Sequence, residues 1–159
     1  MRACYESLTS VRIGLVLDEL ARGGTELQFT LIACGLAEAG HEVSMFVLRP
    51  LRPGGVGLRG RLDQAGVPVT HGPRTVAGGT IAYARWLRRT RPDVVHVALI
   101  RTSLMASIAT NVPGHPPLVM SRRYLASARN DSALRRAVVR DSLRRAREIV
   151  ANSQAAAVD

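Results

Sequence analysis

The stretch Val11–Glu26, VRIGLVLDELARGGTE, decides the fold of this chain. It opens with a short apolar run, Ile13–Leu17, of the length that a buried parallel strand needs. Asp18 ends the run, and Gly23 and Gly24 precede a segment with helical periodicity. A strand, a glycine turn and a helix N-terminus together suit an anionic ligand, because glycines admit it closely and free N–H groups point at it. An ordinary tight turn is the alternative interpretation of the two glycines.

The segment after the glycines has the pattern of a helix. Thr25 and Gln28 have the spacing of a capping box, which predicts a helix from Thr25 to about Ala39. Gly40 is expected to terminate it. The apolar positions that recur at helical spacing in this segment are Leu27, Leu31, Cys34 and Leu36.

The rest of the chain alternates between strand and helix patterns. Further strands are predicted at residues 42–48, 66–70, 94–97, 118–120 and 148–151. Further helices are predicted at about 58–64, 80–90, 103–110 and 132–147, and another begins at Asn152. Residues 49–60 are rich in Pro, Gly and Arg and are expected to form a mobile surface loop. Pro68 favours an edge position for its strand. The alternation predicts an α/β fold, a doubly wound, Rossmann-like and mainly parallel six-stranded sheet with helices on both faces.

Length and composition limit the classes of protein. A chain of 159 residues buries one good core, so residues 11–159 are expected to form one domain after a flexible lead at 1–10. The net charge is +10, and every basic residue is arginine. A basic surface attracts phosphorylated substrates, anionic lipid or nucleic acid. The 4% aromatic content makes nucleic acid the least favoured of these, because single-stranded binders stack bases on rings.

Several features bear on the compartment. Residues 1–10 lack the apolar region of a signal peptide, and no apolar run is long enough to span a bilayer. Cys4 and Cys34 have no metal-ligand spacing, so we expect no metal site and a reducing compartment. These features predict a cytoplasmic protein, and the basic charge leaves the inner face of the membrane open as a partner. The arginine-rich helix at 132–147 is interpreted as packed on the core with a charged outer face, with anionic lipid or nucleic acid as alternative contacts.

A candidate site follows from the expected topology. In a doubly wound sheet, ligands bind outside the carboxyl ends of the strands, where the strand order reverses. For the order 3-2-1-4-5-6, the glycines at 23–24, His96 and the run at 121–123 would face one crevice. His96 is expected to act there as a base or polar ligand, although a histidine satisfied by backbone is equally compatible. Arg122 and Arg123 could clamp a phosphate or form a solvated pair.

Other chemistry finds no support in the sequence. No GxGxxG follows the first strand, and a chain without lysine has no Walker-type phosphate loop. HExxH, CxxC and GxSxG are also absent from the sequence. Dinucleotide oxidoreductase, metalloprotease, zinc-ribbon and serine-hydrolase interpretations are therefore disfavoured.

Residues 23–26 (GGTE) form a Gly-Gly-x-Glu sequence, and residues 36–43 (LAEAGHEV) form a Leu-Ala-x-x-Gly-His-Glu-Val phrase. In both, the sequence resembles the N-terminal domain of family 4 retaining glycosyltransferases, which have the GT-B fold. Residues 91–96 (RPDVVH), 118–125 (LVMSRRYL) and 149–153 (IVANS) are similar to later phrases of the family. The likeness covers residues 11–159, and its first block is the most specific.

The resemblance implies a retaining transfer of a sugar from a nucleotide-sugar donor to a saccharide or lipid-linked acceptor. It implies neither a cofactor nor an essential metal. The residues implied to meet the donor diphosphate are Gly23, Gly24 and Thr25, with His96 as the catalytic residue. The residues expected to bind the acceptor or a phosphate are Ser121, Arg122 and Arg123. Many members carry a second histidine where this chain has Ala98.

The resemblance also implies a second domain. In the family that domain holds most nucleotide-sugar contacts and a Glu-x7-Glu pair, and no two glutamates here have that spacing. We therefore expect an acceptor-side domain, of the kind that builds cell-envelope polysaccharide, that is inactive without a donor-binding domain in cis or in trans. The alternative is a non-catalytic module of the same fold that binds a nucleotide, anionic lipid or a partner subunit.

Overall fold

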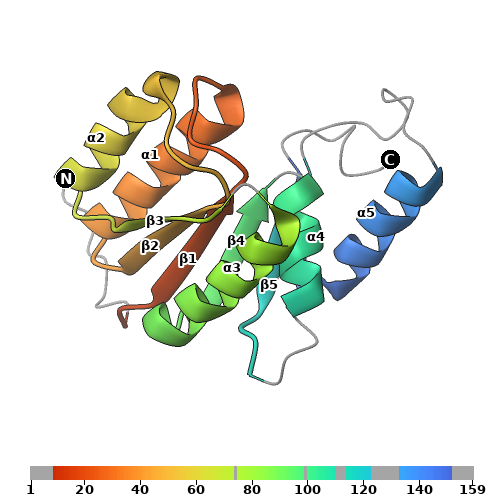
Figure 1. The fold of residues 1–159 in the computed structure, drawn as a ribbon. Coiled ribbons are helices and arrows are strands. Elements are labelled where there is room, and N and C mark those ends of the chain that lie inside the picture. Colours follow the sequence, from red (N-terminus) through yellow and green to blue (C-terminus); the bar gives the residue numbers. More distant parts are fainter. Residues whose placement is uncertain (1–8, 74, 99, 110–113, 123–132, 152–159) are drawn as a thin grey trace.

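The predicted strands form one parallel sheet. The computed structural model describes residues 9–73, 75–98, 100–109, 114–122 and 133–151 (Figure 1). The strands are β1 (Arg12–Leu17), β2 (Glu42–Val47), β3 (Val69–His71), β4 (Val94–Ala98), β5 (Leu118–Arg122) and β6 (Glu148–Ala151). Their order is β3-β2-β1-β4-β5-β6, and every pairing is parallel. The predicted α/β doubly wound fold is confirmed, with β3 at an edge as expected.

Helices cover both faces of the sheet. The described helices are α1 (Gly24–Glu38), α2 (Val56–Gln64), α3 (Val76–Thr90), α4 (Ile100–Ala109) and α5 (Ala133–Arg145). Figure 1 shows α1 and α2 on one side of the sheet and α3, α4 and α5 on the other. The buried side chains separate in the same way, because successive strand residues point to opposite faces. Side chains of α1 and α2 pack with Leu15 and Met45, whereas those of α3 and α4 pack with Val16 and Val95.

Trp86 is the largest buried side chain on the α3 side. Its ring centroid lies 5.8 Å from that of Phe46 and 5.7 Å from that of Tyr83. Gly14 of β1 lies directly beneath it, and a Cβ on Gly14 would lie 2.6 Å from Trp86 Cη2. The missing side chain of Gly14 therefore lets the indole pack on the strand backbone.

The structure corrects three predictions about α1. The helix begins at Gly24 with Gly23 as its N-cap and has no side-chain cap, so the capping box at Thr25 was wrong. Its buried residues are Phe29, Thr30 and Ala33. Leu27 and Leu31 are 41% and 52% exposed, so the predicted apolar face was wrong at these positions. The termination at Gly40 is confirmed: its φ is +88°, and its N–H donates to the carbonyl of Ala37 at 3.0 Å.

Other boundaries also differ from the predictions. Residues 49–52 are irregular as expected, but the rest of the expected loop at 49–60 forms a short 3-10 helix, η1 (Pro53–Gly55), and the start of α2 at Val56. α3 begins before residue 80, because the Thr75 hydroxyl caps it by accepting from the N–H of Gly78 at 3.3 Å. The third strand occupies Val69–His71 rather than 66–70, and α4 begins before residue 103. The lead at 1–8, including Cys4, and the predicted helix from Asn152 lie outside the described residues.

A half-buried polar contact joins α3 to the residues before β5. The His115 Nδ1 lies 2.6 Å from the carbonyl oxygen of Pro116, so this nitrogen carries the proton and donates it. Nε2 is then free to accept from the Tyr83 hydroxyl, which lies 3.3 Å away. Burial lowers the pKa of His115 below its ordinary value of 6.5 and raises the pKa of Tyr83. The contact requires a neutral imidazole.

We expect this contact to make stability depend on pH. The unfolded chain protonates His115 more readily than the folded chain, so the free energy of unfolding should fall as the pH drops below about 6.5. Asp93 has a separate window: its hydrogen bond to Arg12 lowers its pKa below 3.8, so its contribution is lost only in stronger acid. Urea titrations at a series of pH values would measure this dependence. His115→Gln should flatten the slope of the free energy of unfolding against pH near pH 6. An unchanged slope in that variant would contradict the assignment.

Candidate functional site

The sheet reverses its strand order between β1 and β4. β1 pairs with β2 on one side and β4 on the other, with Val16 opposite Val97. The chain leaves β1 for α1 on one face and leaves β4 for α4 on the other face (Figure 1). This is the predicted switch point, and a ligand crevice is expected at the carboxyl ends of these strands.

The N-terminus of α1 is open at this edge. Gly23 is extended, with φ −161° and ψ 159°, and its carbonyl accepts from the N–H of Leu27 at 3.0 Å. A Cβ on Gly24 would meet no atom within 4 Å, and the φ of Gly24 is not positive. Neither backbone conformation nor packing therefore requires glycine at 24. A Cβ on Gly23 would meet only the carboxylate of Glu26, which belongs to the first turn of the helix.

His96 and Ser121 lie together on the α1 side of the sheet. His96 Nε2 is 2.8 Å from Ser121 Oγ, and the imidazole and Phe29 ring centroids are 4.8 Å apart. Phe29 belongs to the second turn of α1, so this helix covers His96 while its own N-terminus extends to the carboxyl edge. The structure thus groups the α1 N-terminus, His96 and Ser121, and their roles remain predictions.

The remaining predicted site residues are only partly described. Thr25 is half-buried in the first turn of α1. Arg122 ends β5, but its side chain lies outside the described part of the chain, as does the whole of Arg123. The arginine clamp therefore stays a prediction.

Sequence reasoning missed a network of ion pairs at the carboxyl ends of β1 and β2. Arg49 Nη2 lies 3.1 Å from Asp18 Oδ2, and Arg49 Nη1 lies 3.7 Å from Glu19 Oε2. Arg52 Nη1 is 3.9 Å from the same Glu19 oxygen. Asp18 had been interpreted only as the end of a strand. The available signal was that charged residues follow both strands at the edge where a ligand is expected.

His71 extends this network to the end of β3. Its Nδ1 lies 2.8 Å from the carbonyl oxygen of Arg49 and therefore donates to it. Within the described ranges, neither His71 Nε2 nor Asp18 Oδ1 has a hydrogen-bond partner, and both atoms are buried. In the neutral ring Nε2 is an acceptor, as is the carboxylate oxygen. Both atoms are therefore buried acceptors for which the described residues supply no donor.

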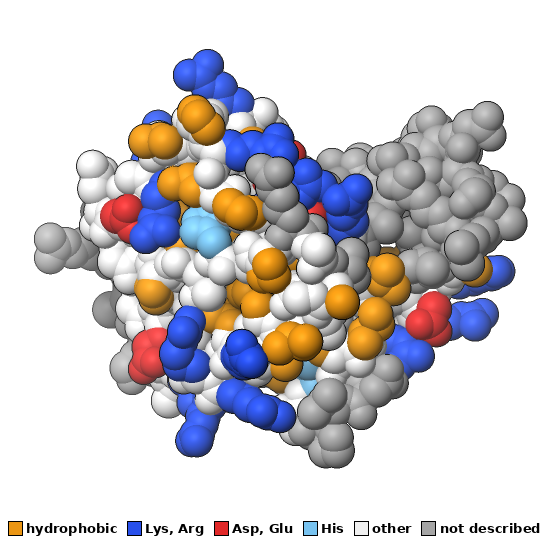
Figure 2. All heavy atoms as spheres, in the orientation of Figure 1, with side chains coloured by type: hydrophobic (Ala, Val, Ile, Leu, Met, Phe, Trp, Pro, Cys, Tyr) orange, Lys and Arg blue, Asp and Glu red, His pale blue; other side chains and the backbone are white. Residues whose placement is uncertain are grey.

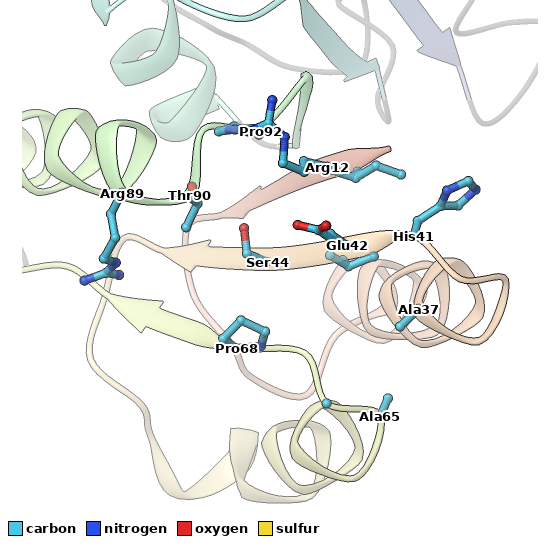
Figure 3. Close-up of a pocket in the computed structure, with 13 residues that line it drawn as sticks. Arg12, Ala37, His41, Glu42, Ser44, Ala65, Pro68, Arg89, Thr90 and Pro92 are labelled. Carbon is cyan, nitrogen blue, oxygen red and sulfur yellow. The ribbon is translucent and has the colours of Figure 1, made fainter. Parts of the chain in front are cut away.

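A cavity of about 530 Å³ lies at the opposite, amino edge of the sheet. Figure 3 shows Glu42, Ser44 and Thr90 around this space, whereas the Arg89 guanidinium points away from it. Arg89 donates instead to the Thr70 hydroxyl at 2.8 Å. Because ligands of doubly wound sheets bind at the carboxyl edge, this cavity is not the candidate catalytic crevice.

The described residues contain neither a candidate metal centre nor a candidate membrane-spanning helix. No group of three or more His, Cys, Asp or Glu side chains in these ranges could hold a metal ion. None of the helices that the structure describes is both long and apolar enough to cross a membrane.

Comparison with known proteins identifies a family. A family model described as Glycosyltransferase Family 4 matches residues 22–159, which is most of the chain. No curated protein matches it. The matched range begins just before Gly23 and includes every residue of the predicted site. It therefore agrees with the resemblance found in the sequence.

Proposed function

Because the chain belongs to glycosyltransferase family 4, we propose that it is the N-terminal, acceptor-side domain of a retaining glycosyltransferase. This enzyme would transfer a sugar from a nucleotide-sugar to a saccharide or lipid-linked acceptor. The observation that carries the proposal is the open N-terminus of α1, where the fold does not require Gly24 to be glycine. At a helix N-terminus on the carboxyl edge of the sheet, a ligand that approaches the backbone would account for this glycine.

The donor diphosphate is the ligand that best suits this position. The first N–H groups of α1 and the positive end of its dipole favour an anion. Negative charge grows on the diphosphate as its bond to the sugar breaks. N–H groups that are already fixed in place therefore stabilise the transition state more than they stabilise the bound nucleotide-sugar. Gly23, Gly24 and Thr25 would supply this contact. It requires no metal or cofactor.

The neighbouring polar groups suit an acceptor sugar. Asp18 Oδ1 and His71 Nε2 are buried acceptors without a donor among the described residues, and sugar hydroxyls are donors. Arg122 and Arg123 would add positive charge for an acceptor that carries phosphate. The hydroxyl groups of a saccharide, free or lipid-linked, would supply donors for the acceptors on Asp18 and His71.

His96 and Ser121 are proposed to act as a pair beside the reacting sugar. Their 2.8 Å hydrogen bond orients each side chain toward the other, so removing either one should remove this orientation from its partner. In the complete enzyme we expect His96→Ala and Ser121→Ala each to lower kcat about tenfold, as for one lost hydrogen bond. The kcat of the double variant should be only slightly lower than the kcat of either single variant. Fully additive losses would show that the two residues act separately.

The proposal includes a second, donor-binding domain, in cis or in trans. Hexosyl transfer requires two aligned substrates and the exclusion of water, which a cleft that closes between two domains provides. The 159-residue chain should therefore catalyse no transfer alone, and the complete enzyme should work in the cytoplasm, where nucleotide-sugars are made.

The test is to incubate the complete enzyme with a panel of nucleoside-diphosphate sugars and follow nucleotide release. We expect one donor to be consumed, and NMR of the product should show the anomeric configuration of the donor. Inversion of that configuration would contradict the retaining mechanism. Inactivity with every donor, in a folded preparation, would favour the non-catalytic alternative.

A further inference from the structure

The charge of this chain is divided unevenly along its length. Residues 1–73 contain seven arginines and seven acidic residues, whereas residues 74–159 contain fifteen arginines and five acidic residues. The net charge of +10 therefore comes entirely from the second part. That part supplies α3, α4 and α5, whereas α1 and α2 come from the balanced first part. The helices follow this division, because α1 and α2 contain two arginines and three acidic residues, whereas α3, α4 and α5 contain nine arginines and one acidic residue.

We call the outer surface of α3, α4 and α5 the basic face. Neither α3 nor α4 contains an acidic residue. Figure 2 views this side and shows arginines over the ends of α3 and α5, with hydrophobic side chains between them. The exposed arginines described on these helices are Arg85, Arg88, Arg89, Arg101, Arg140, Arg144 and Arg145.

Helix dipoles explain only some of these charges. Arg88 and Arg89 lie in the last turn of α3, where a cation is favourable. Arg85 lies in the middle of the helix, where the dipole contributes little. Arg101 is the second residue of α4, where the dipole disfavours a cation. An external anion would account for an exposed positive charge at both positions.

The exposed apolar side chains identify the kind of anion. Ile81 of α3 is 56% exposed and Ile108 of α4 is 46% exposed, among the arginines of the same face. Isoleucine beside arginine suits a bilayer interface, where the apolar group enters the headgroup region and the cation meets phosphate. Surfaces that bind single-stranded nucleic acid use exposed aromatic rings. The described aromatic residues, Phe29, Phe46, Tyr83 and Trp86, are all buried.

A cavity at the amino edge adjoins the basic face. It has a volume of about 580 Å³, and Arg12, Arg88 and Arg91 line it together with apolar residues such as Leu87. Arg12 is neutralised by Asp93, with Nη2 2.6 Å from Oδ1. No carboxylate in the described ranges pairs with Arg88 or Arg91, and Arg91 is in the left-handed region with φ 44°. The cavity thus combines positive charge with apolar walls, as a phospholipid headgroup requires.

We propose that the domain docks on an anionic phospholipid bilayer through the basic face. The arginines contact lipid phosphates, Ile81 and Ile108 enter the headgroup region, and the amino-edge cavity receives a headgroup. The α1 face and the carboxyl edge remain uncovered in this arrangement. The inference does not depend on transferase activity, because it rests on charge and exposure away from the candidate catalytic crevice.

The test is sedimentation of the 159-residue chain with vesicles. One set contains phosphatidylcholine alone, and the other contains equal parts of phosphatidylcholine and phosphatidylglycerol. We expect binding only to the second set. At about 1 kcal/mol per basic residue near the surface, Arg85→Glu/Arg88→Glu should weaken binding at least about 30-fold. The matched control is Arg59→Glu/Arg61→Glu on α2, which changes the net charge equally and should weaken binding less than about threefold.

A second variant tests the apolar contribution. Ile81→Ser/Ile108→Ser should weaken vesicle binding at least about fivefold while leaving its dependence on salt unchanged. Equal losses in both arginine variants would overturn the proposal, because binding would then follow net charge rather than one face. Equal binding to phosphatidylcholine alone would also overturn it. Binding to a DNA duplex that needs Arg85 and Arg88 but not the two isoleucines would assign the face to nucleic acid instead.

Discussion

Gly24→Val is expected to lower kcat/KM of the complete enzyme about 100-fold, whereas Gly35→Val should leave it nearly unchanged. Valine at 24 would project into the open space over the α1 N-terminus and hold a diphosphate away from the N–H groups. A 100-fold loss corresponds to about 2.7 kcal/mol, the scale of one or two hydrogen bonds to a charged group. Steady-state kinetics with the donor identified for the enzyme would measure it.

Gly35 is a matched control because it lies in the same helix. A Cβ there also meets nothing within 4 Å, but Gly35 lies toward the C-terminal end of α1, away from the crevice. Both variants should therefore unfold at similar temperatures. Equal activity of the two variants would contradict a role for Gly24 in binding the donor. A much lower Tm for Gly24→Val would assign the loss to folding instead.

Trp86→Ala is expected to destabilise the folded chain by about 3–5 kcal/mol. The indole is buried against Phe46 and Tyr83, so its removal leaves a large cavity between the sheet and α3. Its Nε1 has no hydrogen-bond partner in the part of the chain that the structure describes, so the loss measures packing alone. Chemical denaturation followed by circular dichroism would quantify it, and an effect below about 1 kcal/mol would contradict this packing.

Gly14 provides an internal check on the same contact. Gly14→Ala should lower the free energy of unfolding by about 1–3 kcal/mol, because the new Cβ would lie 2.6 Å from Trp86 Cη2. Trp86→Leu removes that atom, so the double variant should be more stable than the two separate losses predict. Simple additivity would show that the strain at Gly14 arises elsewhere.

The strand order could be predicted because each buried strand is a short apolar run bounded by turn residues. The side of α1 that packs against the sheet could not be predicted, because apolar residues occur almost all round this helix. Leu27 and Leu31 fit the helical period as well as Phe29 and Ala33, and only the position of the sheet distinguishes them.

The candidate site shows the same limit. The placement of Gly23, Gly24, His96 and Ser121 could be predicted because each lies near or beyond the carboxyl end of a predicted strand, where this topology binds ligands. The network of Asp18, Glu19, Arg49 and His71 could not. It depends on which charged side chains meet after three strands have paired, and no local motif marks such a meeting.

The division of charge between the two faces also makes the domain an electric dipole. In the field of a negatively charged surface, such a molecule experiences a torque that turns its positive side forward. The field extends about 8 Å at physiological ionic strength, so reorientation begins before any side chain touches the surface. The arginines would then act first on the rate of productive encounters, which salt should slow by screening. A domain that arrives already oriented needs no search over its surface after contact.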